Sequence, residues 1–197
     1  MCATLDYYEQ HAARFAADTL DVDMSALHER FLAGLPPLAR ILDAGCGSGR
    51  DSRAFLQRGH RVHAIDASPA LARIATANIG QQVEVLHIED LDAKACYEGI
   101  WACASLLHLP EAAMPDALRR LWTALKPGGV LYVSFKYGDR EYAEAGRHFT
   151  DATEPRLRDW CRELKDLQAI ECWLTEDQRP GRSQTWLNAL LHRGPGP

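Results

Sequence analysis

A glycine-rich loop is the first part of the sequence whose residue types suit ligand chemistry. It spans residues 43–50, reads Asp-Ala-Gly-Cys-Gly-Ser-Gly-Arg, and joins an apolar run to an amphipathic one. Glycines between a strand and a helix let the backbone approach a ligand at the carboxyl edge of a sheet. Arg50 stands where the dinucleotide fingerprint has its third glycine, and the Asp43 carboxylate would repel a pyrophosphate. The loop predicts a site for a ligand with cationic groups, contacted by Asp43, Gly45, Cys46, Gly47, Gly49 and Arg50.

Acidic residues follow the next two apolar runs. Asp66 ends the run 61–65, and an acid at that place can accept hydrogen bonds from both hydroxyls of a ribose. Glu89 and Asp90 follow the run 83–88, where they would stand beside an adenine in the same crevice. Asp90 fits a helix N-cap equally well. Further contacts to this ligand are predicted at Ala67, Ser68, Leu91, Ala104 and Ser105.

A second group of residues predicts where a substrate binds. His108 follows the fourth apolar run, and its neutral imidazole can take a proton near pH 7, although a helix-entry residue would look the same. Tyr137 and His148 are the other candidates for proton transfer. Arginine matches carboxylates and phosphates, so this group would suit an anionic small molecule. Its predicted binding residues are Lys136, Arg147, Phe149, Arg179, Trp186 and Asn188.

Each of these candidates has a plainer alternative. Residues 137–150 are polar and carry two glycines, which is also typical of a long solvated loop. Trp186 would equally suit a core. Asn188, two residues later, would point to the same face of the strand, where a buried amide needs a polar partner. On the first helix, Tyr8 and Phe15 either close over the cofactor as a lid or pack as an ordinary amphipathic face.

Short apolar runs that alternate with amphipathic stretches must position these residues. The alternation begins at residue 40 and predicts βαβ units, hence a parallel sheet covered on both faces. The expected strands are 41–42, 62–65, 83–88, 100–104 and 130–135, and the expected helices between them are 51–58, 69–78 and 111–125. Residues 4–33 are expected to be helical. After a further helix near 157–164, the runs 167–174 and 185–191 predict a terminal hairpin.

Composition narrows the class of protein. The chain has 197 residues, 47% of them hydrophobic, and a net charge of -5, which disfavours nonspecific binding to nucleic acid or anionic membranes. No window reaches the roughly 20 apolar residues of a membrane helix, and no secretion signal is evident, so a cytoplasmic location is expected. The six cysteines form no CxxC pair and the eight histidines show no ligand spacing, so no metal is expected. No oligomeric state is predicted.

These motifs resemble those of class I S-adenosylmethionine-dependent methyltransferases, from about Tyr8 to the C-terminus. Residues 41–49 look like the first motif of that family, and Asp66 looks like the acid after its second strand. Residues 101–109 resemble the fourth-strand motif, and residues 125–129 the turn before the fifth strand. Residues 49–52 are similar to the helix entry of the tellurite-resistance-related group. The resemblance implies a Rossmann-like, doubly wound, seven-stranded, mostly parallel α/β sheet with a C-terminal antiparallel hairpin.

The resemblance also implies the reaction. The expected activity is methyl transfer from S-adenosyl-L-methionine to a small-molecule acceptor by in-line displacement, which releases S-adenosyl-L-homocysteine. Alternatives are methylation of RNA or protein, and a module that binds the cofactor without catalysis. A nicotinamide-dependent oxidoreductase is disfavoured by the charge of Asp43. One domain is expected, with a helical cap (1–37), a cofactor-binding core (38–136) and a substrate-side region (137–197).

Overall fold

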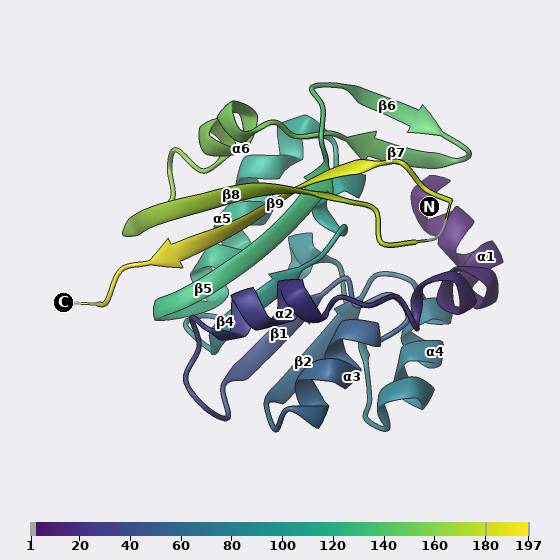
Figure 1. The fold of residues 1–197 in the computed structure, drawn as a ribbon, viewed down its shortest axis with the longest axis horizontal. Coiled ribbons are helices and arrows are strands. Elements are labelled where there is room, and N and C mark those ends of the chain that lie inside the picture. The colour runs from purple at the N-terminus through teal and green to yellow at the C-terminus, as the bar shows by residue number, and fades with distance from the viewer. Residues whose placement is uncertain (1–2, 180, 197) are drawn as a thin grey trace.

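The protein is built around one seven-stranded sheet. The structure, a computed structural model, describes residues 3–179 and 181–196 (Figure 1). The strand order is β3-β2-β1-β4-β5-β9-β8, with parallel pairing from β3 to β5 and antiparallel pairing of β9 to both β5 and β8. The strands are β1 (Arg40–Ala44), β2 (Arg61–Asp66), β3 (Glu84–Val85), β4 (Tyr97–Ala102), β5 (Leu125–Lys136), β8 (Leu167–Glu176) and β9 (Thr185–Arg193). The predicted fold class and the terminal hairpin are confirmed.

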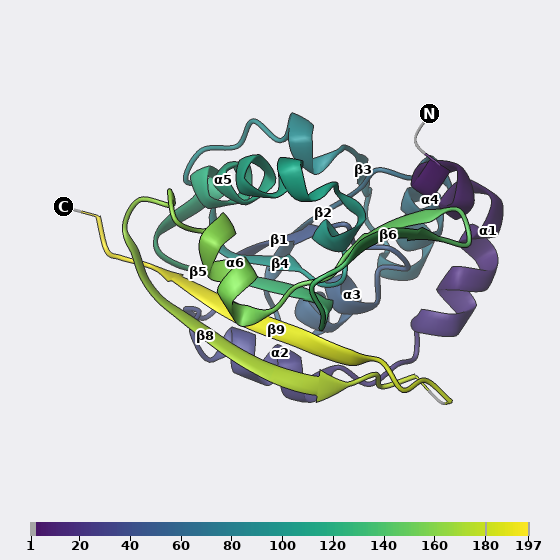
Figure 2. The same cartoon turned by 90° about the horizontal axis from the view of Figure 1, so that it is seen from above.

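Helices cover both faces of this sheet. They are α1 (Ala3–Thr19), α2 (Ser25–Leu32), α3 (Arg50–Gln57), α4 (Pro69–Ile79), α5 (Met114–Ala124) and α6 (Glu154–Trp160). Helices α5 and α6 lie on one face, and α2 and α3 lie on the other (Figure 2). Helix α4 packs on β2 through small apolar side chains, and α1 packs against α4 outside the sheet.

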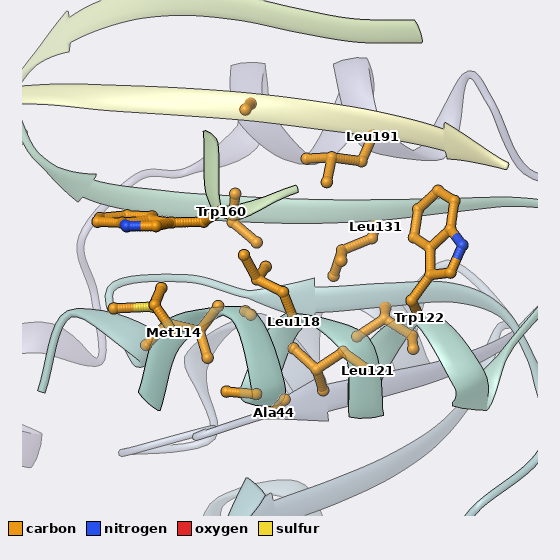
Figure 3. Close-up of a cluster of buried hydrophobic side chains, with 14 of the residues drawn as sticks. Ala44, Met114, Leu118, Leu121, Trp122, Leu131, Trp160 and Leu191 are labelled. Atoms are coloured by element: carbon orange, nitrogen blue, oxygen red, sulfur yellow. The ribbon is translucent and has the colours of Figure 1, made fainter. Parts of the chain in front are cut away.

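The largest core lies between α5 and the sheet. Met114, Leu118 and Leu121 recur at helical spacing, and their side chains face the sheet residue Leu131 and its neighbours (Figure 3). These residues are fully buried. Alternate residues of β5 and β9 reach this core, while the residues between them face the other side of the sheet. The core therefore fixes which side chains of β5 and β9 are free to line a site.

Three local expectations are wrong. Residues 141–150 do not form an open loop, because β6 (Glu141–Glu144) and β7 (Arg147–Thr150) pair as an antiparallel hairpin. The strand expected at residues 83–88 is shorter, because β3 has only two residues and a 3₁₀ turn (Ile88–Asp90) follows it. Residues 125–129 belong to β5, which begins directly after α5 and changes register before Val130.

In the part of the chain that the structure describes, no helix is both long and apolar enough to cross a membrane.

Candidate functional site

A cavity of about 720 Å³ opens where the parallel strands end. It is lined by the turns that follow β1, β2, β3 and β4 and by the C-terminal half of β5, with walls from α1, β7 and the β8–β9 hairpin. The strand order reverses between β1 and β4, and ligands of open α/β sheets bind at such a switch point. The fold thus brings the predicted cofactor and substrate residues to one cavity of a size typical for small molecules.

The glycine loop forms the floor of this cavity. Gly45, Gly47 and Gly49 have positive φ angles of 81°, 56° and 79°, which side chains rarely allow. A Cβ atom on Gly45 would lie 2.5 Å from the Ser105 Cβ, so the turn after β1 and the turn after β4 touch only because residue 45 is glycine. The buried Ser105 Oγ has no hydrogen-bond partner among the described residues. The Ser105 hydroxyl is therefore available to donate or accept a hydrogen bond beside the floor of the cavity.

Asp66 is held rigidly at the end of β2. One carboxylate oxygen accepts the Gly47 backbone N–H at 2.8 Å, and the other accepts the Ser68 N–H at 2.9 Å. The side chain lines the cavity although the residue is only 8% exposed, and burial raises its pKa. Each carboxylate oxygen can accept more than one hydrogen bond, so Asp66 is able to receive the two hydroxyls of a ribose.

Asp43 lies below the cavity instead of at its mouth. The residue is 1% exposed, does not line the cavity, and accepts the Ser52 hydroxyl at 2.6 Å. Burial, together with the nearby Asp51 carboxylate, raises its pKa. The expected direct contact between Asp43 and a cationic ligand is therefore not in the structure, because β1 continues through residue 44 and buries this carboxylate.

Asp51 organises the polar floor beside it, and the sequence reasoning did not identify this residue. Both oxygens accept from the Arg50 guanidinium at 2.8 Å, while Trp101 Nε1 donates to one of them and His28 Nε2 contacts the other at 2.9 Å. Burial opposes its ionisation, but the Arg50 guanidinium holds the pKa of Asp51 below its ordinary value. Arg50 thus lines the cavity as a neutralised cation.

His108 is joined to Tyr8 at the centre of the cavity. Its Nδ1 lies 2.7 Å from the His148 carbonyl oxygen, which can only accept, so Nδ1 carries the proton. Nε2 is then the acceptor for the Tyr8 hydroxyl at 2.8 Å. Burial lowers the pKa of His108 to about 4, and the charges of Arg147 and Lys136 act in the same direction. The imidazole is therefore neutral and basic at Nε2.

The sheet supplies a polar wall. Ser134 pairs with Asn188, and Lys136 pairs with Trp186, across the antiparallel β5–β9 register, and all four line the cavity. Asn188 has the partners that its burial requires, because its carbonyl accepts the Tyr132 hydroxyl at 2.7 Å and its amide donates to Thr175 at 2.9 Å. Tyr132 also lines the cavity and was missed, although the alternation of residues 132, 134 and 136 would have indicated it.

Helix α1 closes one side of the cavity and is fastened to four surrounding elements. Glu9 accepts from the Ser68 hydroxyl and from the Ala70 N–H at the start of α4. Thr4 accepts the His148 N–H at 2.9 Å, and Thr19 donates to Ser48 at 3.2 Å. Tyr8 supplies the fourth contact through its hydrogen bond to His108. The face of α1 that carries Tyr8 and Phe15 lines the cavity and also packs against α4, as the second expectation has it. Closure over a cofactor stays a prediction.

Most of the predicted site residues meet in this cavity. Those that line it are Tyr8, Gly45, Cys46, Gly47, Arg50, Asp66, Ala67, Ser68, Glu89, Ala104, Ser105, His108, Lys136, Arg147, Phe149, Arg179, Trp186 and Asn188. Those that do not are Asp43, Gly49, Asp90, Leu91, Tyr137 and His148.

The structure explains why several predicted site residues lie outside the cavity. Leu91 is buried in the core beside α5, and Tyr137 is 47% exposed beyond the end of β5. The His148 side chain turns to Glu141 and Thr150, and only its backbone reaches His108. Gly49 packs against Ala75 of α4, where a Cβ would not fit. Among the described residues, no group of three or more His, Cys, Asp or Glu side chains could hold a metal ion.

The fold and the site define a Rossmann-like methyltransferase, and the comparisons agree. A family model described as a methyltransferase domain matches residues 41–129. A ubiquinone biosynthesis O-methyltransferase of Xanthomonas axonopodis pv. citri is 36% identical over 179 residues, which cover 76% of this chain and 74% of that protein. The chain therefore belongs to the class I S-adenosylmethionine-dependent methyltransferases, whose methyl donor is S-adenosylmethionine.

Two further relatives show how far the similarity extends. A ubiquinone biosynthesis O-methyltransferase of Xylella fastidiosa is 42% identical over 104 residues, which cover 49% of this chain but only 41% of that protein. A crystal structure of the 1,6-didemethyltoxoflavin-N1-methyltransferase of Burkholderia thailandensis, with bound 1,6-didemethyltoxoflavin and S-adenosylhomocysteine, has a TM-score of 0.78 at 26% identity. That match covers 96% of this chain and 85% of the other.

Proposed function

We propose that the protein transfers a methyl group from S-adenosylmethionine to a small-molecule acceptor and releases S-adenosylhomocysteine. One observation carries the proposal: a single cavity joins the glycine loop and Asp66 to His108, Lys136 and Arg147. Both kinds of relative support a small acceptor, since one is named for ubiquinone biosynthesis and the other holds 1,6-didemethyltoxoflavin. A cytoplasmic location stays a prediction.

The cofactor half of the cavity fits a nucleoside. We propose that Asp66 accepts hydrogen bonds from the ribose hydroxyls, that Glu89 stands beside the adenine, and that Gly45 and Gly47 leave room for the rest of the ligand. The unpartnered Ser105 hydroxyl is a further contact. When bound, S-adenosylmethionine supplies an electrophilic methyl group, whose bond to sulfur breaks as the sulfur keeps the electron pair. The protein chiefly aligns the acceptor with that methyl and excludes water.

His108 is the proposed proton acceptor. As the lone pair of the acceptor atom forms its bond to the methyl carbon, the proton of that atom passes to His108 Nε2, the nitrogen that now faces Tyr8. The His148 carbonyl keeps the imidazole in the required tautomer. Tyr8 must either yield its place to the acceptor or pass the proton through its own hydroxyl. The roles predicted for Tyr137 and His148 side chains receive no support from cavity contacts.

Methyl transfer from labelled S-adenosylmethionine into a cell extract tests the proposal. We expect an enzyme-dependent labelled product, distinct from S-adenosylmethionine, in the low-molecular-mass fraction. Label confined to the large fraction would instead mean an RNA or protein methyltransferase, and no label together with cofactor binding would mean a binding module. The variant Asp66→Asn should lose most of its affinity for S-adenosylhomocysteine in calorimetry. Glu163→Gln, which also converts a carboxylate to its amide but at an exposed residue outside the cavity, is the matched control.

A further inference from the structure

The acceptor half of the cavity carries two cations on one aromatic ring. Lys136 Nζ lies 3.6 Å from the centroid of the Phe149 ring, and the Arg147 guanidinium carbon lies 5.0 Å from it. Both side chains line the cavity, one from the end of β5 and the other from the start of β7. Two like charges held against one ring repel each other unless an anion joins them.

The other buried cations of the cavity are neutralised by the protein itself. Arg50 is paired with Asp51 at 2.8 Å, and Arg179 is paired with Asp177 at 2.5 Å. Arg147 differs, because no carboxylate of the described residues lies within 4.0 Å of it. Its Nε is buried and has no hydrogen-bond partner in the described chain. A guanidinium that lines a cavity and has no carboxylate partner among the described residues suits an external anion.

Lys136 is only weakly compensated. Its Nζ donates to the Tyr142 hydroxyl at 2.9 Å, and the nearest carboxylate oxygen, of Glu144, is 3.9 Å away on a side chain that is 64% exposed. Asp66 and Glu89 line the cofactor half, and Glu144, Glu176 and Asp177 line other parts of the cavity. Asp177 is paired with Arg179, and Glu144 approaches Lys136 no closer than 3.9 Å, so Arg147 and Lys136 leave positive charge near His108. Both cations help to lower the pKa of His108.

Resting on the proposed function, we infer that the methyl acceptor is an anionic small molecule. A carboxylate or phosphate group of the acceptor binds between Arg147 and Lys136, and the atom that receives the methyl is a different one, directed at His108. Arginine offers two parallel donors to such a group, and lysine adds a point charge. Phe149 is buried beneath both cations, and its ring holds them beside each other at the cavity wall.

Anion-exchange chromatography of the labelled product tests this inference without knowledge of the acceptor. The low-molecular-mass fraction of the methyl-transfer assay is applied to an anion exchanger at pH 8, where unreacted S-adenosylmethionine is cationic and passes through. We expect the labelled product to be retained. An enzyme-dependent labelled product that passes through, once resolved from S-adenosylmethionine on a cation exchanger, would overturn the inference and leave the proposed function intact. Absence of any enzyme-dependent labelled small molecule other than S-adenosylmethionine would instead contradict the proposed function.

Variants test the two cations directly, with the low-molecular-mass fraction of the cell extract as the source of the acceptor. Arg147→Gln and Lys136→Gln should each raise the KM for the acceptor about tenfold or more, since each loses a charge-assisted hydrogen bond. Their affinity for S-adenosylhomocysteine should stay within about twofold of the wild type, which also shows that they fold. Arg162→Gln, at an exposed arginine outside the cavity, is the matched control. An unchanged KM in both cation variants would overturn the inference.

Discussion

His108 illustrates how two contacts decide the chemistry of one side chain. The His148 carbonyl fixes the proton on Nδ1, and the Tyr8 hydroxyl marks Nε2 as the basic nitrogen. Burial is the main reason that its pKa falls to about 4, far below the ordinary value of 6.5. A histidine in this environment remains a neutral base throughout the physiological range.

The pH dependence of turnover should therefore report His108. Protonation blocks Nε2 only as the pH falls through about 4, so we expect the acid limb of kcat/KM, which reports the free enzyme, near that pH and not near 6.5. His108→Gln should remove this limb and lower kcat by roughly 10²–10⁴-fold. His148→Gln keeps the backbone carbonyl but removes an imidazole whose charge helps to lower the pKa of His108, so its acid limb should remain and shift to slightly higher pH. A wild-type limb near pH 6.5 would contradict the assignment.

Gly45 is a second position where one residue controls the site. Alanine there meets the Ser105 Cβ at 2.5 Å in addition to an unfavourable φ of 81°. Left-handed strain costs about 1–2 kcal/mol and overpacking about 1–3 kcal/mol, so Gly45→Ala should lower the free energy of unfolding by about 2–5 kcal/mol. Gly80→Ala has a similar φ in open space and should cost only about 1–2 kcal/mol. Urea denaturation of both variants measures the difference, and equal losses would rule out the contact with Ser105.

At the scale of elements, α1 gives the cavity its closed side. Few apolar side chains attach this helix, and its polar tethers reach the glycine loop, α4, β7 and the turn that holds His108. Glu9 contributes two of these hydrogen bonds and places a carboxylate at the N-terminus of α4, where it interacts favourably with the helix dipole.

Loss of the two Glu9 hydrogen bonds should loosen α1 selectively. We expect Glu9→Ala to speed hydrogen exchange across residues 3–19, because an N-cap contact of this kind is worth about 0.5–2 kcal/mol. Affinity for S-adenosylhomocysteine should also fall, since Tyr8 and Phe15 line the cavity from the same helix. Glu29→Ala, at an exposed residue of α2, is the control. If hydrogen exchange in α1 is unchanged, the Glu9 hydrogen bonds are not needed to hold this helix in place.

At the scale of the whole molecule, the cavity draws on nearly the full length of the chain. Its lining runs from Thr4 of α1 to Asn188 of β9, so a ligand bound there contacts elements from both ends. The division into a helical cap, a cofactor-binding core and a substrate-side region stays a prediction, and so does the narrower resemblance to the tellurite-resistance-related group.

Ligand binding should accordingly stabilise the entire fold. S-Adenosylhomocysteine at 100 times its Kd should add about 2.7 kcal/mol to the free energy of unfolding. For a chain of this size that corresponds to a rise in Tm of about 5–10 °C. NADH should give no comparable rise, because the site lacks the third glycine of a dinucleotide loop. A thermal shift produced by NADH alone would contradict the cofactor assignment.

The sequence by itself determined the parts of this protein that are encoded locally. A strand, a turn and a helix follow one another between residues 40 and 57 around the glycine loop, so the place of this loop at the sheet edge, and that of Asp66, could be predicted from short patterns of residues. The same holds for the order of strands and helices and for the terminal hairpin.

Only the tertiary structure decided which of these residues meet. Thr4 and His148 are 144 positions apart, and Tyr8 and His108 are 100 positions apart, yet each pair shares a hydrogen bond that shapes the cavity. Burial depth decided the outcome for Asp43, which has the expected place in sequence but lies beneath the floor. Side-chain contacts of this kind depend on how α1, β7 and β4 pack together, and no local periodicity carries that information.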